Sequence, residues 1–204
     1  MVKLSGGAMG VKKVLNVGGN NKSIPLPVQY AGYEHILLDI DPKGDPDIVC
    51  DARELASLEG DQFDAVYCSH NLEHYYRHDV SRVLGGFFHI LKPSGFVQVL
   101  VPDLGEVMKI CVEKGLDIED ELYRSPAGPI MVLDVLYGYG IEIERSGQDF
   151  YAHKTGFTHS SLKRALSSSG FSKIFCSTGN LEINAIAFKQ EPDQETRELF
   201  HLQT

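Results

Sequence analysis

Two adjacent glycines follow a short apolar run near the start of the chain, in the segment VLNVGGNNKSIPLP. A glycine at the end of a buried strand lets the backbone pass close to a ligand, and the exposed amide groups there can bind an anionic group. Gly18 and Gly19 therefore predict a ligand-binding loop, with an ordinary turn after a strand as the alternative. Pro25 and Pro27 stand where a helix would begin, so we expect the first crossover helix to be short or missing.

Three carboxylates follow the next two apolar runs. Asp39 and Asp41 lie in HILLDIDP, and Asp51 lies in DIVCDA. A carboxylate at the end of the second strand of a nucleotide-binding sheet commonly holds ribose hydroxyls, because it can accept a hydrogen bond from both at once. Asp51 also has a structural alternative, since aspartate favours the N-cap position and the helix-like sequence ARELASL follows it.

The segment SHNLEHYYRH contains the pattern H-x-x-E-H at residues 70–74, which is a signature of zinc peptidases. That signature requires a helix with both histidines on one face, whereas this segment follows directly on the strand-like run FDAVYC. Zinc hydrolysis is therefore kept only as an alternative, and we expect no bound metal. The cysteines form no C-x-x-C pair, which indicates reduced thiols rather than a zinc knuckle or a disulfide framework. They are Cys50, Cys68, Cys111 and Cys176.

Apolar runs alternate with amphipathic segments through the first half of the chain, which is typical of βαβ units around a parallel sheet. The five predicted strands cover residues 12–18, 35–40, 47–50, 63–69 and 95–102. Apolar residues at helical spacing predict a helix between the fourth and fifth strands, before the turn KPSG. Near the end, SSLKRALSSSGF predicts a helix, and SKIFCST and LEINAIAFK around a GN turn predict a β-hairpin. An antiparallel pair therefore closes the sheet.

The alternation breaks between Leu104 and Phe157, so residues 104–157 are expected to form a mostly helical insertion. It leaves the sheet at the carboxyl end of the fifth strand, the edge at which ligands bind in open α/β sheets. This position predicts a lid over the acceptor side of a site, with a dimerisation arm, and hence a homodimer, as the alternative. We expect residues 1–204 to form a single domain.

Composition limits the classes of function. The chain has 204 residues, 43% of them hydrophobic, which suits one α/β core. The net charge of −9 and the lack of a basic cluster argue against nucleic acid as a partner. No run approaches the roughly 20 apolar residues of a membrane span, and the first residues do not resemble a signal peptide. We therefore expect a soluble cytoplasmic protein.

The predicted α/β fold, a Rossmann-like sheet of seven mostly parallel strands with a C-terminal antiparallel hairpin, resembles class I S-adenosylmethionine-dependent methyltransferases. Residues 63–103 are similar to the type 11 methyltransferases, in which a strand, an LEH sequence, a helix and an LKPGG turn lead into the next strand. Ser94 replaces the first glycine of that turn. The resemblance covers roughly residues 12–103, resumes at residues 157–171 and leaves out the insertion.

The resemblance implies S-adenosyl-L-methionine as the cofactor. In such enzymes an acid and G-x-G after the first strand hold the amino-acid end of the cofactor. Here Asn16 stands for the acid and Asn20 for the second glycine, around Gly18 and Gly19. Asparagine tolerates left-handed backbone angles, so Asn20 is expected to adopt the conformation of the glycine that it replaces.

The resemblance also implies where the nucleoside binds. Asp39 would bind the ribose, with Asp41 as alternative or helper. Asp51 would accept from the adenine amino group, while the Ala52 N–H would donate to a ring nitrogen. Ser69 would complete the cofactor site at the end of the fourth strand.

The predicted function is methyl transfer to a small-molecule acceptor by in-line displacement. His70 lies where the methyl group would face the acceptor, and His153 lies where the insertion re-enters the sheet. Either is a candidate catalytic base. Because the glycine loop departs from the family pattern, a non-catalytic cofactor-binding or regulatory domain is the main alternative.

Overall fold

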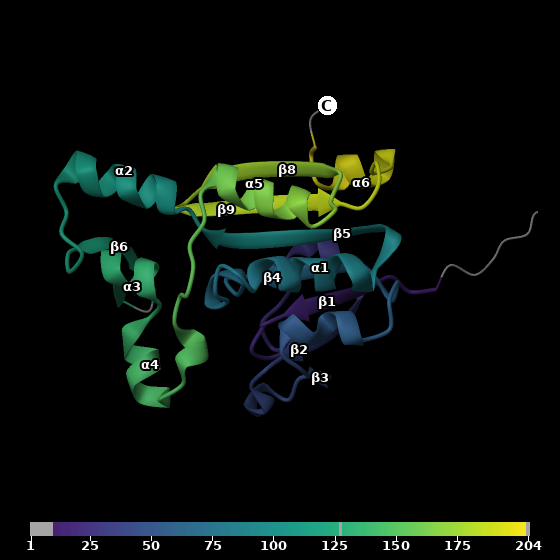
Figure 1. Ribbon diagram of the computed structural model, residues 1–204, viewed down its shortest axis with the longest axis horizontal. Helices are drawn as coiled ribbons and strands as arrows, with labels where there is room; N and C mark the ends of the chain where they lie inside the picture. The colour runs from purple at the N-terminus through teal and green to yellow at the C-terminus, as the bar shows by residue number, and fades with distance from the viewer. Residues whose placement is uncertain (1–9, 127, 203–204) are drawn as a thin grey trace, which may run out of the picture.

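A computed structural model describes residues 10–126 and 128–202 (Figure 1). Its main sheet has seven strands in the order β3-β2-β1-β4-β5-β9-β8. Neighbouring strands from β3 to β5 pair in parallel, whereas β9 is antiparallel to both β5 and β8. The strands are β1 Lys13–Val17, β2 Glu34–Asp39, β3 Ile48–Val49, β4 Phe63–Ser69, β5 Leu91–Pro102, β8 Lys173–Gly179 and β9 Glu182–Phe188. The predicted parallel sheet closed by a C-terminal hairpin is confirmed.

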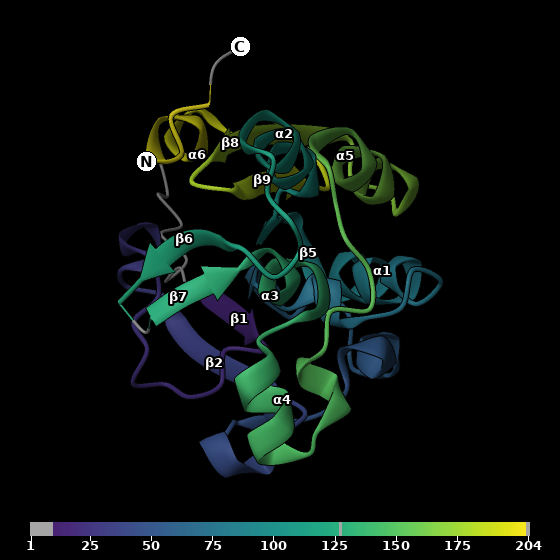
Figure 2. The same ribbon diagram turned by 90° about the vertical axis from the view of Figure 1, so that its left-hand side faces the viewer.

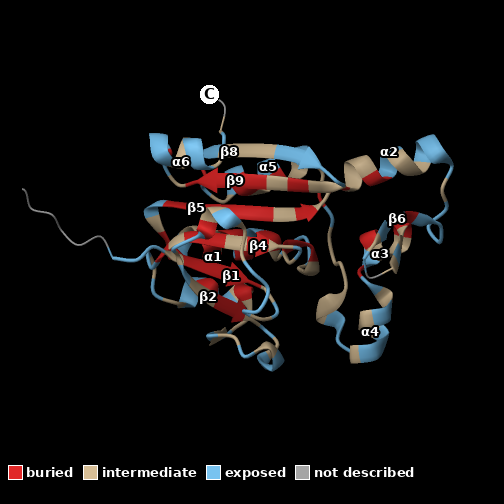
Figure 3. Cartoon of the chain, turned by 180° about the vertical axis from the view of Figure 1, so that it is seen from behind, coloured by how far each residue is buried: buried red, intermediate tan, exposed pale blue. Residues whose placement is uncertain are grey.

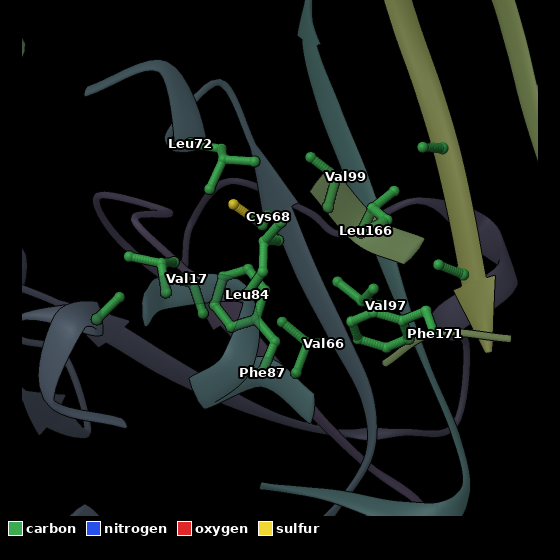
Figure 4. Close-up of a cluster of buried hydrophobic side chains, with 14 of the residues drawn as sticks. Val17, Val66, Cys68, Leu72, Leu84, Phe87, Val97, Val99, Leu166 and Phe171 are labelled. Carbon is green, nitrogen blue, oxygen red and sulfur yellow. The ribbon is translucent and has the colours of Figure 1, made fainter. Parts of the chain in front are cut away.

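One face of the sheet is covered by α1, Val80–Ile90, and α5, His159–Ser168, as Figure 2 shows along the sheet edge. The apolar spacing of α1 predicts this, because it places Leu84 and Phe87 on one side of the helix. Those residues pack on β4 and β5 side chains such as Val66 and Val97 in the largest buried cluster (Figure 4). The core therefore lies between α1, α5 and the middle of the sheet.

The other face has a thinner cover. A 3₁₀ turn, Val28–Tyr30, replaces the first crossover helix, as the two prolines predict. Tyr30 is buried against Phe96, with ring centroids 6.3 Å apart, and its hydroxyl donates to Gln98 Oε1 at 2.8 Å. The C-terminal helix α6, Gln194–Leu199, precedes Phe200, whose ring also packs on Phe96. Aromatic side chains thus occupy the place of the missing helix.

Three local elements differ in detail from the sequence-based expectations. The helix expected at ARELASL is a 3₁₀ helix, Ala52–Ser57, and β3 has only two residues. The fifth strand begins at Leu91 rather than after the KPSG turn, with an irregular register opposite Phe63 and Ala65. The turn residues therefore belong to the strand and form a bulge in it. The spacing of apolar residues in the sequence does not indicate such a bulge.

The insertion contains helices, as the sequence predicts, and also a two-stranded sheet that the sequence did not predict. It contains α2 Leu104–Lys114, an antiparallel pair formed by β6 Glu121–Ser125 and β7 Gly128–Met131, then α3 Val132–Tyr137 and α4 Gly140–Ser146. Its small core joins Val107, Leu122 and Val135, and Leu181 of the β8–β9 turn packs against it. Figure 2 shows the insertion in front of the edge at which the parallel strands end.

The insertion leaves and re-enters the sheet at one point. Asp103 bridges Phe157, and the Leu104 N–H donates to the Phe157 carbonyl at 2.9 Å. Most of its outer surface is exposed or half-buried, in contrast to the buried central strands (Figure 3). It is therefore an appendage on a complete sheet rather than part of the sheet core.

Replacing Phe87 by alanine is expected to lower the free energy of unfolding by about 3–5 kcal/mol, because a fully buried ring leaves a cavity between α1 and the sheet. Urea denaturation followed by circular dichroism measures the change. Val112→Ala is the control, since Val112 is 84% exposed and its loss should change stability by no more than about 0.5 kcal/mol. Equal effects of the two substitutions would contradict the assignment of the core.

Candidate active site

A cavity of about 230 Å³ opens where β1, β2 and β4 end. The loops after these strands form one wall, and the return segment of the insertion, at Phe150, Tyr151 and Lys154, forms the other. The remaining residues that line the cavity are Gly18, Asn20, Asp39, Ile40, Asp41, Asp51, Arg53, His70, Asn71, His74, Tyr75, Tyr76 and Asp79. Six of the residues predicted from the sequence therefore share one cavity: Gly18, Asn20, Asp39, Asp41, Asp51 and His70.

The glycine loop is packed too tightly for side chains at its two glycines. Gly18 has φ +71°, and a Cβ there would overlap the side-chain amide of Asn71. A Cβ on Gly19 would overlap the side chain of Asn16, which is 4% exposed and lies beneath the loop, 3.2 Å from His35 Nε2. Asn20 has φ 63°, which confirms the predicted left-handed conformation. Asn16 and Gly19 support the loop and do not line the cavity.

The carboxylate of Asp39 fixes the loop. Its Oδ2 accepts from the Asn20 N–H at 3.0 Å, and its Oδ1 accepts from the Asp41 N–H at 2.9 Å. An ionised carboxylate has about four acceptor sites, so two remain for hydroxyl groups in the cavity. Asp41 caps the next turn through the Lys43 N–H at 3.0 Å. Both carboxylates line the cavity, where they can accept hydrogen bonds from hydroxyl groups.

Asp51 makes an ion pair inside the cavity wall. Its carboxylate accepts from the Arg53 backbone at 2.9 Å and from the Arg53 guanidinium at 2.6 and 3.0 Å. Burial opposes ionisation, but these hydrogen bonds lower the pKa of Asp51. The predicted N-cap role is therefore confirmed, whereas contact with adenine stays a prediction. Ala52 is 1% exposed and lies outside the cavity lining.

His70 stands at the end of β4 in a left-handed conformation, with φ 48°, directly after Ser69. Its Nε2 lies 2.5 Å from Glu182 Oε1 and its Nδ1 lies 3.5 Å from Glu73 Oε1. The hydrogen bond to Glu182 and then the nearby carboxylate of Glu73 raise the pKa of His70 to about 10. The ring is thus held as a cation between two carboxylates. Glu182 comes from β9, far along the chain, so residue spacing does not indicate this pair. Ser69 does not line the cavity.

His153 lies apart from His70. Its Nδ1 lies 2.9 Å from the Val135 carbonyl, and its ring packs on His74 with centroids 5.0 Å apart. Burial lowers the pKa of His74, whose ring lies between His70 and His153. The structure therefore does not bring the two candidate bases into one cavity.

Several cavity residues were missed by sequence reasoning. Asn71 follows His70 at the strand exit, and its buried Oδ1 has no hydrogen-bond partner within residues 10–126 and 128–202. Lys154 Nζ lies 5.6 Å from the centre of the Tyr76 ring, and its side chain is 17% exposed. The sequence signal for this wall is the aromatic and basic run DFYAHK just before the insertion returns to the sheet.

Comparisons with known proteins agree with this geometry. A family model described as a methyltransferase domain matches residues 15–99. Similar folds include a SAM-dependent methyltransferase from Archaeoglobus fulgidus, with a TM-score of 0.55, 18% identity and coverage of 87% of this chain and 86% of that chain. A protein from Pyrococcus horikoshii has a TM-score of 0.57, 16% identity and coverage of 88% and 84%. A possible histamine N-methyltransferase from Thermotoga maritima has a TM-score of 0.51, 13% identity and coverage of 90% and 84%. No curated protein matches the chain.

Residues 15–99 thus match a methyltransferase domain, and the chain shares its fold with known S-adenosylmethionine-dependent methyltransferases. The cavity fits this cofactor on three points: a close-packed glycine turn after β1, an acceptor carboxylate after β2 and the orphaned amide oxygen of Asn71 beside Gly18. No helix among the described residues is long and apolar enough to cross a membrane.

Asp39→Ala is expected to weaken S-adenosylmethionine binding by about 1.5–3 kcal/mol, because it removes a charged acceptor and the ties to Asn20 and Asp41. Asp41→Ala should weaken binding less. Isothermal titration calorimetry with S-adenosylmethionine and S-adenosylhomocysteine measures both variants. Thermal unfolding checks that each remains folded, and the reverse order would show that Asp41 holds the ribose.

Proposed function

We propose that the protein transfers a methyl group from S-adenosylmethionine to a small-molecule acceptor that binds between the strand ends and the return segment of the insertion. The supporting observation is that one cavity of about 230 Å³ is lined both by Gly18 and Asp39 and by Phe150, Tyr151 and Lys154. In our proposal Gly18 and Asp39 lie on the cofactor side of this cavity, and Phe150, Tyr151 and Lys154 lie on the acceptor side.

The bound cofactor supplies a methyl group already activated by its sulfonium. In our proposal the Asn20 and Gly18 backbone holds the amino-acid end, with Asn16 and Gly19 as the buried support of that loop. Asp39 accepts from the ribose hydroxyls. Asp51 and the Ala52 N–H bind the adenine, and Ser69 supports the strand end next to the reacting atoms. The protein then has to align the acceptor and exclude water.

His70 remains the proposed catalytic residue on the acceptor side. Its two ring nitrogens face Glu182 and Glu73, which hold it as a cation, so it can take a proton from an acceptor only after one contact opens and the ring has released a proton to solvent. The Glu182 side chain is 38% exposed and that of Glu73 is 1% exposed, so an entering acceptor can replace Glu182. His153 lies outside the cavity lining, which disfavours it as the base.

Turnover assays test this function. We expect the full chain to form S-adenosylhomocysteine when sets of small oxygen, nitrogen and carbon nucleophiles are supplied with the cofactor. His70→Ala should retain cofactor affinity within about tenfold, or 1.4 kcal/mol, while losing most turnover. Mass spectrometry of the methylated product names the acceptor class. Cofactor binding without turnover on any set would favour a non-catalytic binding domain.

Replacing residues 106–150 by a short Gly-Ser linker tests the lid. The ends of the insertion already meet at the Asp103–Phe157 bridge, so a short linker can close the gap. We expect cofactor affinity to stay within about tenfold and transfer to be abolished. Size-exclusion chromatography runs beside the assay. A shortened protein with full turnover, or one that becomes monomeric with its activity intact, would show that the segment is not a lid.

A further inference from the structure

The carboxylate of Glu73 is buried without a hydrogen-bond partner among the residues that the structure describes, and its side chain is 1% exposed. A buried ionised carboxylate is costly unless a cation or hydrogen-bond donors compensate it. The His70 ring faces Oε1 with its Nδ1 at 3.5 Å, which is longer than a good hydrogen bond. This carboxylate therefore keeps the capacity to bind a second positively charged group.

Two histidines stand beside this carboxylate. One ligand atom each from Glu73, His74 and His153 lie within 4.8 Å of one another. His74 comes from the exit loop of β4, and His153 comes from the return segment of the insertion. The two segments are already joined there, because the Glu73 carbonyl accepts from the Lys154 N–H at 2.8 Å and the Thr155 N–H at 3.1 Å.

The hydrogen bonds of both rings leave a nitrogen for a cation. His153 Nδ1 donates to the Val135 carbonyl, so Nε2 carries the lone pair, and such a bond to a carbonyl is typical of metal-binding histidines. His74 faces two carbonyl oxygens, Ala152 from Nδ1 and His70 from Nε2, both at 3.1 Å. A neutral ring has one N–H and donates to one of them. Its other nitrogen then faces a carbonyl oxygen that cannot donate to it, so a rotation of the ring is needed to turn that lone pair toward a cation.

We propose that Glu73, His74 and His153 bind one divalent transition-metal ion, with Zn²⁺ the best match, which fastens the return segment of the insertion to the exit loop of β4. One carboxylate oxygen and two imidazole nitrogens are ligands that Zn²⁺ and its first-row neighbours accept. Ligands on tetrahedral Zn²⁺ at about 2.0–2.1 Å lie about 3.4 Å apart, so small side-chain rotations close the present spacing. This site is independent of methyl transfer and reverses the sequence-based expectation of no metal.

The proposed site differs from the zinc-peptidase interpretation of the H-x-x-E-H pattern at residues 70–74. In that motif both histidines bind the metal and the glutamate is the base. Here His70 is held by Glu182, and the glutamate itself is a ligand together with His153, far downstream in the chain. Substitutions of His70 and His153 therefore distinguish the two arrangements.

Metal loading of the full chain, purified without a histidine tag and stripped with a chelator, tests the proposal. We expect one Zn²⁺ per chain by elemental analysis, and visible absorption bands when Co²⁺ is loaded instead. Glu73→Gln and His153→Gln should each weaken Zn²⁺ affinity by at least about tenfold. Added Zn²⁺ should raise the unfolding temperature of the wild type, because it binds the folded state, and should raise that of the variants less.

His78→Ala is the matched control, since the His78 side chain is 79% exposed and lies away from the cluster. It should bind Zn²⁺ as the wild type does. No stoichiometric binding of Zn²⁺, Co²⁺, Mn²⁺ or Fe²⁺ by the wild type overturns the proposal. Zn²⁺ binding that survives in both Glu73→Gln and His153→Gln also overturns the proposal. Zn²⁺ binding that is lost in His70→Ala but kept in His153→Gln overturns it as well. Circular dichroism checks that each variant is folded. If Glu73→Gln does not fold, His153→Gln still tests the site, because glutamine is close to histidine in volume.

Discussion

The parallel pairing of β1 with β2 on one side and with β4 on the other is the constraint on which the site depends. Val14 of β1 lies opposite His35 of β2 and opposite Ala65 of β4. The chain therefore leaves β1 in one direction and later returns on its other side, and the loops after these strands diverge around a crevice. Buried side chains on both faces of β1 lock the register, since a slip by one residue would reverse every side chain. The cavity is a consequence of this order of strands.

The glycine loop lacks the usual crossover helix, and other groups take over the roles of that helix. A helix N-terminus would supply free N–H groups and a partial positive charge. Here the Asp39 carboxylate orders the Asn20 N–H, and the Asn16 amide fills the space below Gly19. The apolar task of the helix passes to Tyr30 and its aromatic neighbours on the thin face of the sheet. An atypical sequence in this loop is therefore compatible with an intact cofactor wall.

Sequence patterns predicted those parts of the molecule that depend on local periodicity. The apolar runs, the amphipathic helix α1 and the hairpin around Asn180 all follow from short-range spacing, and so does the placement of Asp39 at a strand end. Contacts between distant segments did not follow. The His70–Glu182 contact and the contact of His153 with His74 each join residues that lie far apart in the sequence. The spacing of residues along the chain does not predict such contacts, and it also did not indicate the pairing of β6 with β7.

The exit loop of β4 connects the two halves of the site. Within five residues it carries His70, which faces the cavity, and Glu73 and His74, which face the return segment of the insertion. The Glu73 carbonyl holds the backbone of Lys154 and Thr155, and Lys154 in turn lines the cavity over Tyr76. A shift of the return segment therefore moves both the cavity wall and the loop that positions His70. The body of the insertion has its own small core, against which Leu181 of the β8–β9 turn packs. In the proposed lid, coupling to the loop of His70 would follow from these shared backbone contacts and would need no longer pathway.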